Sequence, residues 1–258
     1  MIPVLVAAVL LTGVLVGCGG GGGDGFSGGA SLSTGGQSVA TPGGGAQKAQ
    51  DAAVTQGKPA EDASLCTVEI YGDSIMGFNG TATRPSMVLQ LFRPNLLVVA
   101  DHSIAGQSLA DLATPFPYLT RSAHFVVIEN GVIDAWQGKS INTVISDYYH
   151  IIQQLRAEGR VPVLTGFARQ ARGGELGQYS LLLRDYYDAV LRSIASNTGV
   201  PFADWGAVPF FGAWDLVDFV HPNKNYSDRL IAQLGLALDP LTTHCTNTLF
   251  LPEGAGLT

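Results

Sequence analysis

Residues 66–74 read CTVEIYGDS, an apolar run that stops at a tight Gly-Asp-Ser turn. Residues 67–71 have the length and the β-branched and aromatic content of a buried strand. Glycine and aspartate favour a turn, because glycine tolerates unusual backbone angles and aspartate hydrogen-bonds to nearby backbone. The pattern predicts a strand with Ser74 at its carboxyl end.

Four further apolar runs of the same character follow, at residues 96–100, 125–129, 161–166 and 201–203. Between them, residues 140–158 and 181–196 carry apolar side chains at helical spacing, and the first of these segments begins at a capping serine and stops at a glycine. Nearly continuous apolar strands are typical of parallel sheets covered on both faces. Strands that alternate with helices predict a doubly wound α/β fold.

Polar and glycine-rich segments follow the expected strands. They are residues 72–74, 102–106, 130–134, 167–172 and, after a loop, 218–221. The carboxyl ends of parallel strands meet at one edge of an open sheet, and ligands bind there. We therefore expect these segments to converge on one site.

Ser74, Asp218 and His221 suit nucleophilic catalysis. A serine hydroxyl is a weak nucleophile until a base takes its proton, and histidine titrates close enough to neutrality to act as that base. Taken alone, the Gly-Asp-Ser turn also has a structural explanation as the end of a strand. Asp218 and His221 alone are likewise explained as a capping pair of a last helix at residues 223–236. An α/β-hydrolase elbow is excluded, because Met76 stands where that motif requires glycine.

The segments 72–74 (GDS), 103–106 (SIAG) and 218–221 (DFVH) together resemble the motifs of the GDSL, or SGNH, family of esterases and lipases. The resemblance spans about residues 66–236. It implies a three-layer α/β/α fold of the flavodoxin-like kind, with a five-stranded parallel sheet.

The resemblance also implies roles for single residues. Ser74 corresponds to the nucleophile, His221 to the base and Asp218 to the acid that orients the base. The backbone N–H groups of Ser74 and Gly106 correspond to donors of the oxyanion hole. The chemistry implied is ester hydrolysis through an acyl-serine, with no cofactor and no metal ion.

The third motif departs from the family pattern. The family has Gly-x-Asn-Asp, whose asparagine side chain completes the oxyanion hole, but residues 131–134 read GVID, so Ile133 takes the place of that asparagine. Loss of one such donor costs roughly a hundredfold to a thousandfold in rate. Asn130 lies three positions earlier and is the candidate substitute.

The chain begins with a segment of a different kind. Residues 1–17 are almost wholly apolar, are too short to span a bilayer comfortably, and lead directly into Cys18. The ending LVGC resembles the bacterial lipobox, which predicts a lipid on Cys18; an ordinary secretory signal with an unrelated cysteine is the alternative. Residues 18–62 are rich in glycine, serine and alanine, and this composition predicts a flexible tether.

Residues 63–258 form the expected globular domain. The chain holds 14 basic and 21 acidic residues and no basic cluster, which argues against nucleic acid as a partner. Cys66 and Cys245 bracket the domain. In an exported protein such a pair predicts a disulfide, and two unrelated buried thiols are the alternative.

These observations predict a monomeric, lipid-anchored esterase of the bacterial cell envelope that acts on short acyl or acetyl esters of a polysaccharide or lipid. Two alternatives stay open: an acyltransferase that passes the acyl group to a glycan, and a binding protein without activity. Several loop residues near the expected site either contact substrate or simply bury area: Trp136, Phe167, Arg169, Phe210, Phe211 and Trp214.

Overall fold

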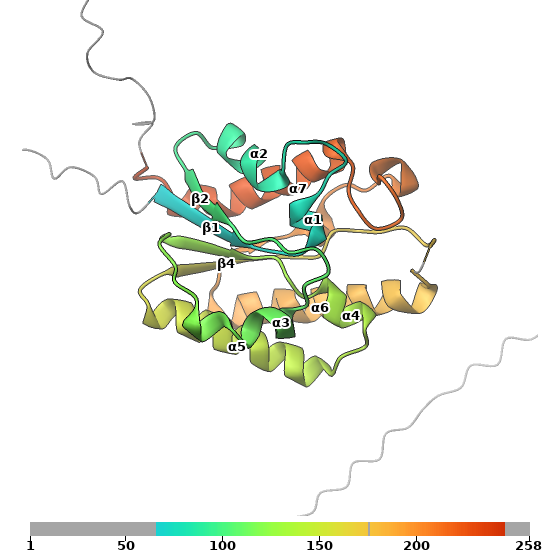
Figure 1. Cartoon of the computed structure of the whole chain (residues 1–258), viewed down its shortest axis with the longest axis horizontal. Coiled ribbons are helices and arrows are strands. Elements are labelled where there is room, and N and C mark those ends of the chain that lie inside the picture. Colours follow the sequence, from blue (N-terminus) through green and yellow to red (C-terminus); the bar gives the residue numbers. More distant parts are fainter. Residues whose placement is uncertain (1–65, 175, 246–258) are drawn as a thin grey trace, which may run out of the picture. The chain divides into compact units, whose positions relative to one another are not determined.

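The computed structural model describes residues 66–174 and 176–245 (Figure 1). The predicted signal segment (1–17), Cys18 and the tether (18–62) lie outside the described residues. The strands are β1 (Thr67–Tyr71), β2 (Leu97–Asp101), β3 (Phe125–Ile128), β4 (Val161–Thr165) and β5 (Phe202–Ala203). The helices are α1 (Ser74–Gly77), α2 (Pro85–Phe92), α3 (Leu109–Ala113), α4 (Val132–Trp136), α5 (Ile141–Ala157), α6 (Gln178–Thr198) and α7 (Lys224–Leu238).

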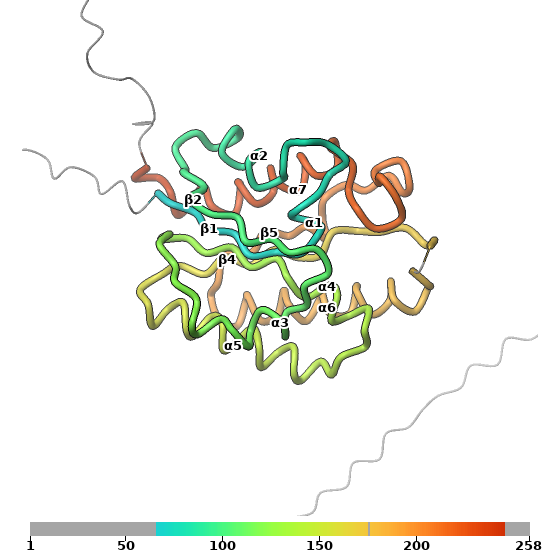
Figure 2. The backbone as a smooth tube through the Cα atoms, viewed as in Figure 1, coloured from blue at the N-terminus to red at the C-terminus, as the bar shows by residue number. Residues whose placement is uncertain are grey.

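The five strands form one parallel sheet in the order β2-β1-β3-β4-β5. This is the flavodoxin-like order, in which the chain reverses its direction of travel across the sheet between β1 and β3. Because the strands run the same way, the segments that follow β1, β2 and β3 meet at one edge (Figures 1 and 2). The predicted fold class is confirmed.

Helices cover both faces of the sheet (Figure 1). Residues of β3 alternate between two apolar cores: Phe125 and Val127 lie in the core shared with α2 and α7, whereas Val126 and Ile128 lie in the core shared with α3, α5 and α6. A strand buried on both sides needs apolar residues at every position, and this is why its sequence is continuous rather than alternating.

The edge strand β2 does not follow this pattern. Its Leu97 and Val99 side chains are exposed, so the expectation of burial on both faces is wrong for this strand. The strand also begins one residue later than predicted, because the N–H of Leu96 donates to Arg93 O in a turn. An edge strand has only one neighbouring strand and is easily left partly uncovered.

The three predicted helices correspond to α5, α6 and α7. Ser140 occupies the N-cap of α5, but its side chain accepts no capping hydrogen bond, contrary to the prediction. Helix α6 is longer than predicted at both ends and stops at Gly199, whose φ of 64° ends a helix in the left-handed conformation. Helix α7 is capped by Asn223, whose Oδ1 accepts the N–H of Tyr226 at 3.0 Å.

Cys66 and Cys245 are joined by a disulfide, with Cα atoms 5.7 Å apart. The predicted pairing is therefore present, rather than two separate thiols. Cys66 directly precedes β1, so the bond lies at the amino edge of the sheet, opposite the edge that Ser74 occupies. Across the two described ranges, no helix combines the length and the apolar character that a membrane crossing requires.

Candidate active site

His221 lies within hydrogen-bond distance of both other predicted catalytic side chains, Ser74 and Asp218. Ser74 opens α1 directly after β1, whereas Asp218 and His221 belong to the loop before α7. His221 Nε2 lies 2.9 Å from Ser74 Oγ, and His221 Nδ1 lies 2.8 Å from Asp218 Oδ2. The fold thus forms a serine, a histidine and an orienting aspartate in the geometry of a hydrolytic triad.

A tight loop fixes the acid and the base. Asp218 Oδ1 accepts the backbone N–H groups of Val220 and His221, each at 2.7 Å. Partial burial acts to raise the pKa of Asp218, but these hydrogen bonds and the imidazole outweigh burial, so the pKa lies below its ordinary value. Asp218 is therefore ionised at neutral pH and holds the Nδ1–H of His221, which leaves Nε2 free to take a proton from Ser74.

Two unpaired backbone N–H groups lie on adjoining turns. Among the described residues, no group accepts a hydrogen bond from the N–H of Ser74 or of Gly106. Gly106 has a φ of 74° in a turn closed by the bond from Gln107 N–H to Ile104 O, a conformation that favours glycine. The N–H of Ile104 donates to Gly72 O at 3.0 Å and so fastens this loop to the nucleophile turn.

Ile133 lies in α4 within the apolar core and supplies no polar group. Asn130 is fully buried, and its Nδ2 donates to Gln107 O at 3.2 Å and to Gln107 Oε1 at 3.3 Å. In this structure, the Asn130 amide therefore supports the residue that follows Gly106. A direct contact between this amide and an oxyanion stays a prediction.

Asp134 has a positioning role that the sequence did not reveal. Its buried carboxylate accepts the N–H of Leu109 at 2.6 Å and lies 3.2 Å from Lys139 Nζ. The same ammonium donates to Ser108 Oγ at 2.8 Å. These contacts fix the start of α3, which is also the end of the loop that carries Gly106.

A second acid, Glu129, adjoins the nucleophile turn. The N–H of Asp73 donates to Glu129 Oε2 at 2.8 Å, and both carboxyl groups are buried. Burial raises the pKa of Asp73 to about 7. Burial and then the charge of Asp73 raise the pKa of Glu129 well above its ordinary value. Sequence analysis missed Glu129, although a carboxylate at the end of an apolar strand is a signal of a buried charge.

The six loop residues singled out in the sequence differ in their exposure. Three of them pack against the two cores: Trp136, Phe167 and Phe210. Arg169 is exposed, and its Nε donates to Gly206 O at 2.8 Å. Phe211 and Trp214 are 67% and 89% exposed, so they are the aromatic side chains of this set that a ligand can reach.

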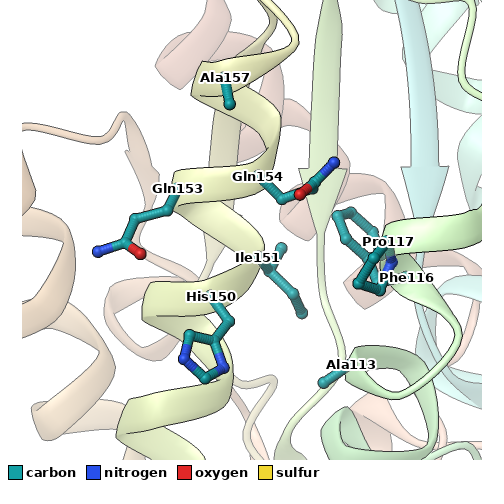
Figure 3. Close-up of a pocket in the computed structure, with 8 residues that line it drawn as sticks. All are labelled: Ala113, Phe116, Pro117, His150, Ile151, Gln153, Gln154 and Ala157. Carbon is teal, nitrogen blue, oxygen red and sulfur yellow. The ribbon is translucent and has the colours of Figure 1, made fainter.

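A mostly apolar cavity of about 220 Å³ adjoins the loop that carries Gly106. Its lining residues are Tyr71, His102, Ile104, Gln107, Leu112, Pro115, Leu119 and Thr120. A separate cavity of about 380 Å³ lies between α5 and the chain around Phe116, and Figure 3 shows the residues that line it. That cavity contains none of the predicted site residues.

The remaining histidines in the described part of the chain have local partners or lie elsewhere. His102 Nε2 lies 2.7 Å from Glu69 Oε1, and its ring stacks on Tyr71. His244 lies beside Cys66 and Cys245 in a group with the composition of a metal site. Both sulfur atoms of this group are bonded to each other in the disulfide.

The model of the GDSL-like lipase/acylhydrolase family matches residues 70–226. This range begins within β1 and includes Ser74, Gly106, Asp218 and His221. No curated protein matches the chain.

Solved structures of similar fold include three esterases or related proteins. The crystal structure of TesA is 23% identical and covers 68% of this chain and 99% of TesA, with a TM-score of 0.56. The psychrotrophic esterase EstA from Pseudoalteromonas sp. is 16% identical and covers 68% of this chain and 98% of EstA, with a TM-score of 0.56. A catalytic mutant of Axe2, an acetylxylan esterase from Geobacillus stearothermophilus, is 17% identical and covers 67% of this chain and 93% of its own, with a TM-score of 0.53. At these identities the likeness establishes the fold.

Proposed function

Because the chain belongs to the GDSL-like lipase/acylhydrolase family, we propose that it is a serine esterase that removes short acyl or acetyl groups through an acyl-serine intermediate. The observation that carries this proposal is the contact of 2.9 Å between His221 Nε2 and Ser74 Oγ, with Asp218 bonded to the other ring nitrogen. Nucleophile, base and orienting acid are the parts that two-step acyl transfer requires.

In the first step, Ser74 Oγ attacks the ester carbonyl carbon while His221 Nε2 takes the hydroxyl proton. The carbonyl oxygen becomes an oxyanion, which accepts hydrogen bonds from the N–H groups of Ser74 and Gly106. Collapse of this intermediate breaks the bond to the alcohol oxygen, and His221 gives its proton to the departing alcohol. The acyl group is then bonded to Ser74.

In the second step, a water molecule attacks the acyl carbon and His221 takes one of its protons. Collapse of the second oxyanion breaks the bond to Ser74 Oγ, which regains its proton from His221. The acid product leaves. Because Ile133 provides no third donor, each oxyanion is held by fewer hydrogen bonds than in relatives with an asparagine there, and we expect a modest turnover.

The cavity that adjoins the Gly106 loop suits a small acyl group. The cavity beside the Gly106 loop, about 220 Å³, is below the range of about 300–1,000 Å³ that holds drug-sized ligands. Phe211 and Trp214 present flat apolar surface in the same loop before α7 that carries Asp218 and His221, and such surface suits the face of a sugar ring. An acylated polysaccharide is the substrate class that we propose, and an acylated lipid is the alternative.

The proposed location is the outer side of a bacterial membrane, with a lipid on Cys18 and residues 18–62 as the tether. The LVGC ending before the glycine-rich stretch supports this proposal. Replacing Cys18 with serine should move the protein from the membrane fraction to the soluble fraction. Unchanged partitioning of the Cys18→Ser variant would refute lipidation.

Hydrolysis is tested with p-nitrophenyl esters from acetate to octanoate, using the purified protein and its Ser74→Ala variant. We expect nitrophenol release that depends on Ser74 and declines with acyl length. Adding an alcohol or oligosaccharide acceptor separates hydrolysis from acyl transfer, because a transferase would form a new ester in place of the free acid. Release that is equal in the two proteins would defeat the esterase proposal.

A further inference from the structure

Asp73 and Glu129 are two buried acids beside the nucleophile, joined by the hydrogen bond from the Asp73 N–H to Glu129 Oε2. Each carboxyl accepts one backbone N–H of the nucleophile turn: Asp73 Oδ1 accepts that of Ile75, and Glu129 Oε2 accepts that of Asp73, each at 2.8 Å. Asp73 Oδ2 is buried and accepts no hydrogen bond from any donor in the described residues. A Cβ at Gly72 would lie 2.8 Å from Glu129 Oε2, so this carboxyl packs directly against the backbone of the nucleophile turn.

Among the described residues, no Lys or Arg side chain pairs with either acid. His221 favours ionisation of Asp73, and Asp134 opposes it. Tyr148 faces the pair from α5 as a neutral phenol, because burial and the nearby acids raise its pKa, and its hydroxyl donates to Asn130 O at 2.5 Å. Two adjacent buried carboxylates with no cation between them do not both ionise at neutral pH, since burial and mutual repulsion both oppose the second charge.

We propose that Asp73 and Glu129 share one proton at neutral pH, and that this proton limits the negative charge beside Ser74 to a single unit. The proton occupies the contact between Asp73 Oδ2 and the Glu129 carboxyl, which accounts for a buried acceptor with no other donor. Neither acid touches the reacting atoms, so both act as positioning residues that set the electrostatic field of the site.

The shared proton has a consequence for catalysis. When it leaves to solvent at alkaline pH, the charge of the pair goes from one negative unit to two. The second unit disfavours the oxyanion that forms on the substrate, so the rate falls at alkaline pH. The last proton of the pair leaves at the higher of the two ionisation steps, and because the pKa of Glu129 is raised well above its ordinary value, this loss occurs above neutral pH.

Infrared spectroscopy tests the proton itself and does not need an active enzyme. A protonated carboxylic acid has a C=O stretching band that is resolved from the carboxylate bands. We expect this band at neutral pH in the unmodified protein and its loss in both Glu129→Gln and Asp73→Asn. The matched control is Glu69→Gln, since Glu69 is also buried but bonds to His102 and not to the pair. A band that persists in both test variants, or that disappears only in the control, overturns the proposal.

The pH dependence of kcat/KM tests the consequence, which rests on the proposed esterase function. A glutamine side chain resembles the protonated acid and keeps the charge of the pair at one negative unit, so Glu129→Gln should change kcat/KM by no more than about twofold at pH 7. At alkaline pH the kcat/KM of the unmodified enzyme should fall by about tenfold, which is the scale of the effect of one added unit charge in partly buried surroundings. The Glu129→Gln variant should keep its kcat/KM at alkaline pH. An alkaline loss equal to that of the unmodified enzyme overturns the proposed effect of the shared proton on catalysis. If no esterase activity is found, the infrared result still decides whether the proton is shared.

Discussion

Asn130 is a fully buried residue that connects α5 to the loop of the oxyanion hole. Its carbonyl oxygen accepts the Tyr148 hydroxyl, and its amide donates to both the backbone and the side chain of Gln107. Gln107 directly follows Gly106, whose N–H must hold a fixed direction to stabilise an oxyanion. We propose that the Asn130 amide acts on the reaction through the position of Gly106.

Removing this amide should slow the chemical step. We expect Asn130→Ala to lower kcat by about tenfold with little change in KM, less than the hundredfold or more that loss of a direct oxyanion donor costs. The Gln107 carbonyl would also lose its donor, which should lower the free energy of unfolding by about 1–3 kcal/mol. Steady-state kinetics and denaturant unfolding measure the two effects.

Gln107→Ala is the matched control, because it removes only the side-chain bond and keeps the bond between Asn130 and the Gln107 backbone oxygen. Its kcat should stay closer to that of the unmodified enzyme. Equal losses of kcat in the two variants would show that the backbone bond has no special part in positioning Gly106.

Arg121 and Glu158 form a pair that stabilises the α5 side of the fold. The Arg121 side chain is almost completely buried, its Nε donates to Glu158 Oε2 at 2.9 Å, and its guanidinium lies 4.1 Å from the centre of the Phe116 ring. The hydrogen bonds from Arg121 are the main reason why the pKa of Glu158 is lowered to about 2. A carboxyl whose pKa is lower in the folded state stabilises the fold above its ordinary pKa and loses this effect as the pH falls.

We expect Glu158→Gln to lower the free energy of unfolding by about 2–3 kcal/mol at pH 7, because it leaves a buried guanidinium without its counter-charge. The difference from the unmodified protein should shrink below pH 4.5 and be lost near pH 2, where Glu158 is itself protonated. Denaturant unfolding at both pH values measures it. Asp228→Asn, which breaks the exposed pair with Lys224, is the control and should cost less than about 1 kcal/mol. A loss that does not vary with pH would contradict the charge explanation.

Sequence could indicate Ser74, Asp218 and His221, because a serine, a histidine and an aspartate at motif spacing have few other uses together. It could not indicate what Glu129 and Asn130 contact. Their partners are 56 and 23 positions away in the chain, and only the completed fold brings these pairs into contact.

At the scale of elements, the loop between β5 and α7 is held rigidly from within. Asp215 is buried, and its Oδ2 accepts the N–H of Phe211 at 2.7 Å and lies 2.7 Å from Arg229 Nη2. Asn223 closes the loop, since its N–H donates to Asp215 O at 2.7 Å and its Nδ2 donates to Trp214 O at 2.8 Å. The exposed Trp214 side chain therefore stands on fixed backbone.

We expect Trp214→Ala to raise KM for an acetylated oligosaccharide by about two- to tenfold, which corresponds to the loss of one aromatic contact of about 0.5–1.5 kcal/mol. The variant should hydrolyse p-nitrophenyl acetate normally, because that ester has no sugar ring. Initial-rate kinetics on both substrates measure the difference. Tyr118→Ala removes a comparably exposed aromatic side chain that precedes β3. It should leave the kinetic constants for both substrates unchanged. An unchanged KM in Trp214→Ala would remove Trp214 from the substrate site.

Sequence predicted all five strands as continuous apolar runs, and it predicted α5, α6 and α7. The long helices α5 and α6 have enough apolar positions for a period to be recognised. Helices α3 and α4, with five residues each, do not. The first depends on a capping box between Ser108 and Asp111, and such short helices are stabilised by their contacts rather than by their own propensity.

At the scale of the whole molecule, the disulfide connects the two ends of the described domain. Cys66 and Cys245 are 179 positions apart, so the bond closes a very large loop. In the chain-entropy description, closing a loop longer than 100 residues lowers the entropy of the unfolded state and so adds about 5 kcal/mol to the free energy of unfolding. The active site lies at the opposite edge of the sheet, so this stabilisation does not bear on the geometry of Ser74.

We expect the Cys66→Ser/Cys245→Ser double variant to lose about 4–5 kcal/mol of unfolding free energy. Its kcat and KM should match those of the unmodified enzyme at a temperature where both are folded. Denaturant unfolding and steady-state kinetics are the measurements. A loss of activity in the folded variant would contradict the separation of the disulfide from the site.

The same bond determines how the domain responds to a pulling force. A load applied between the two ends of the chain passes from Cys66 to Cys245 through a single covalent link. The sheet and its helices are then in parallel with that link, not in series with it, and carry almost none of the tension. Stretching the oxidised protein should leave residues 66–245 folded, and the force peak of the unfolding domain should appear once the disulfide is reduced.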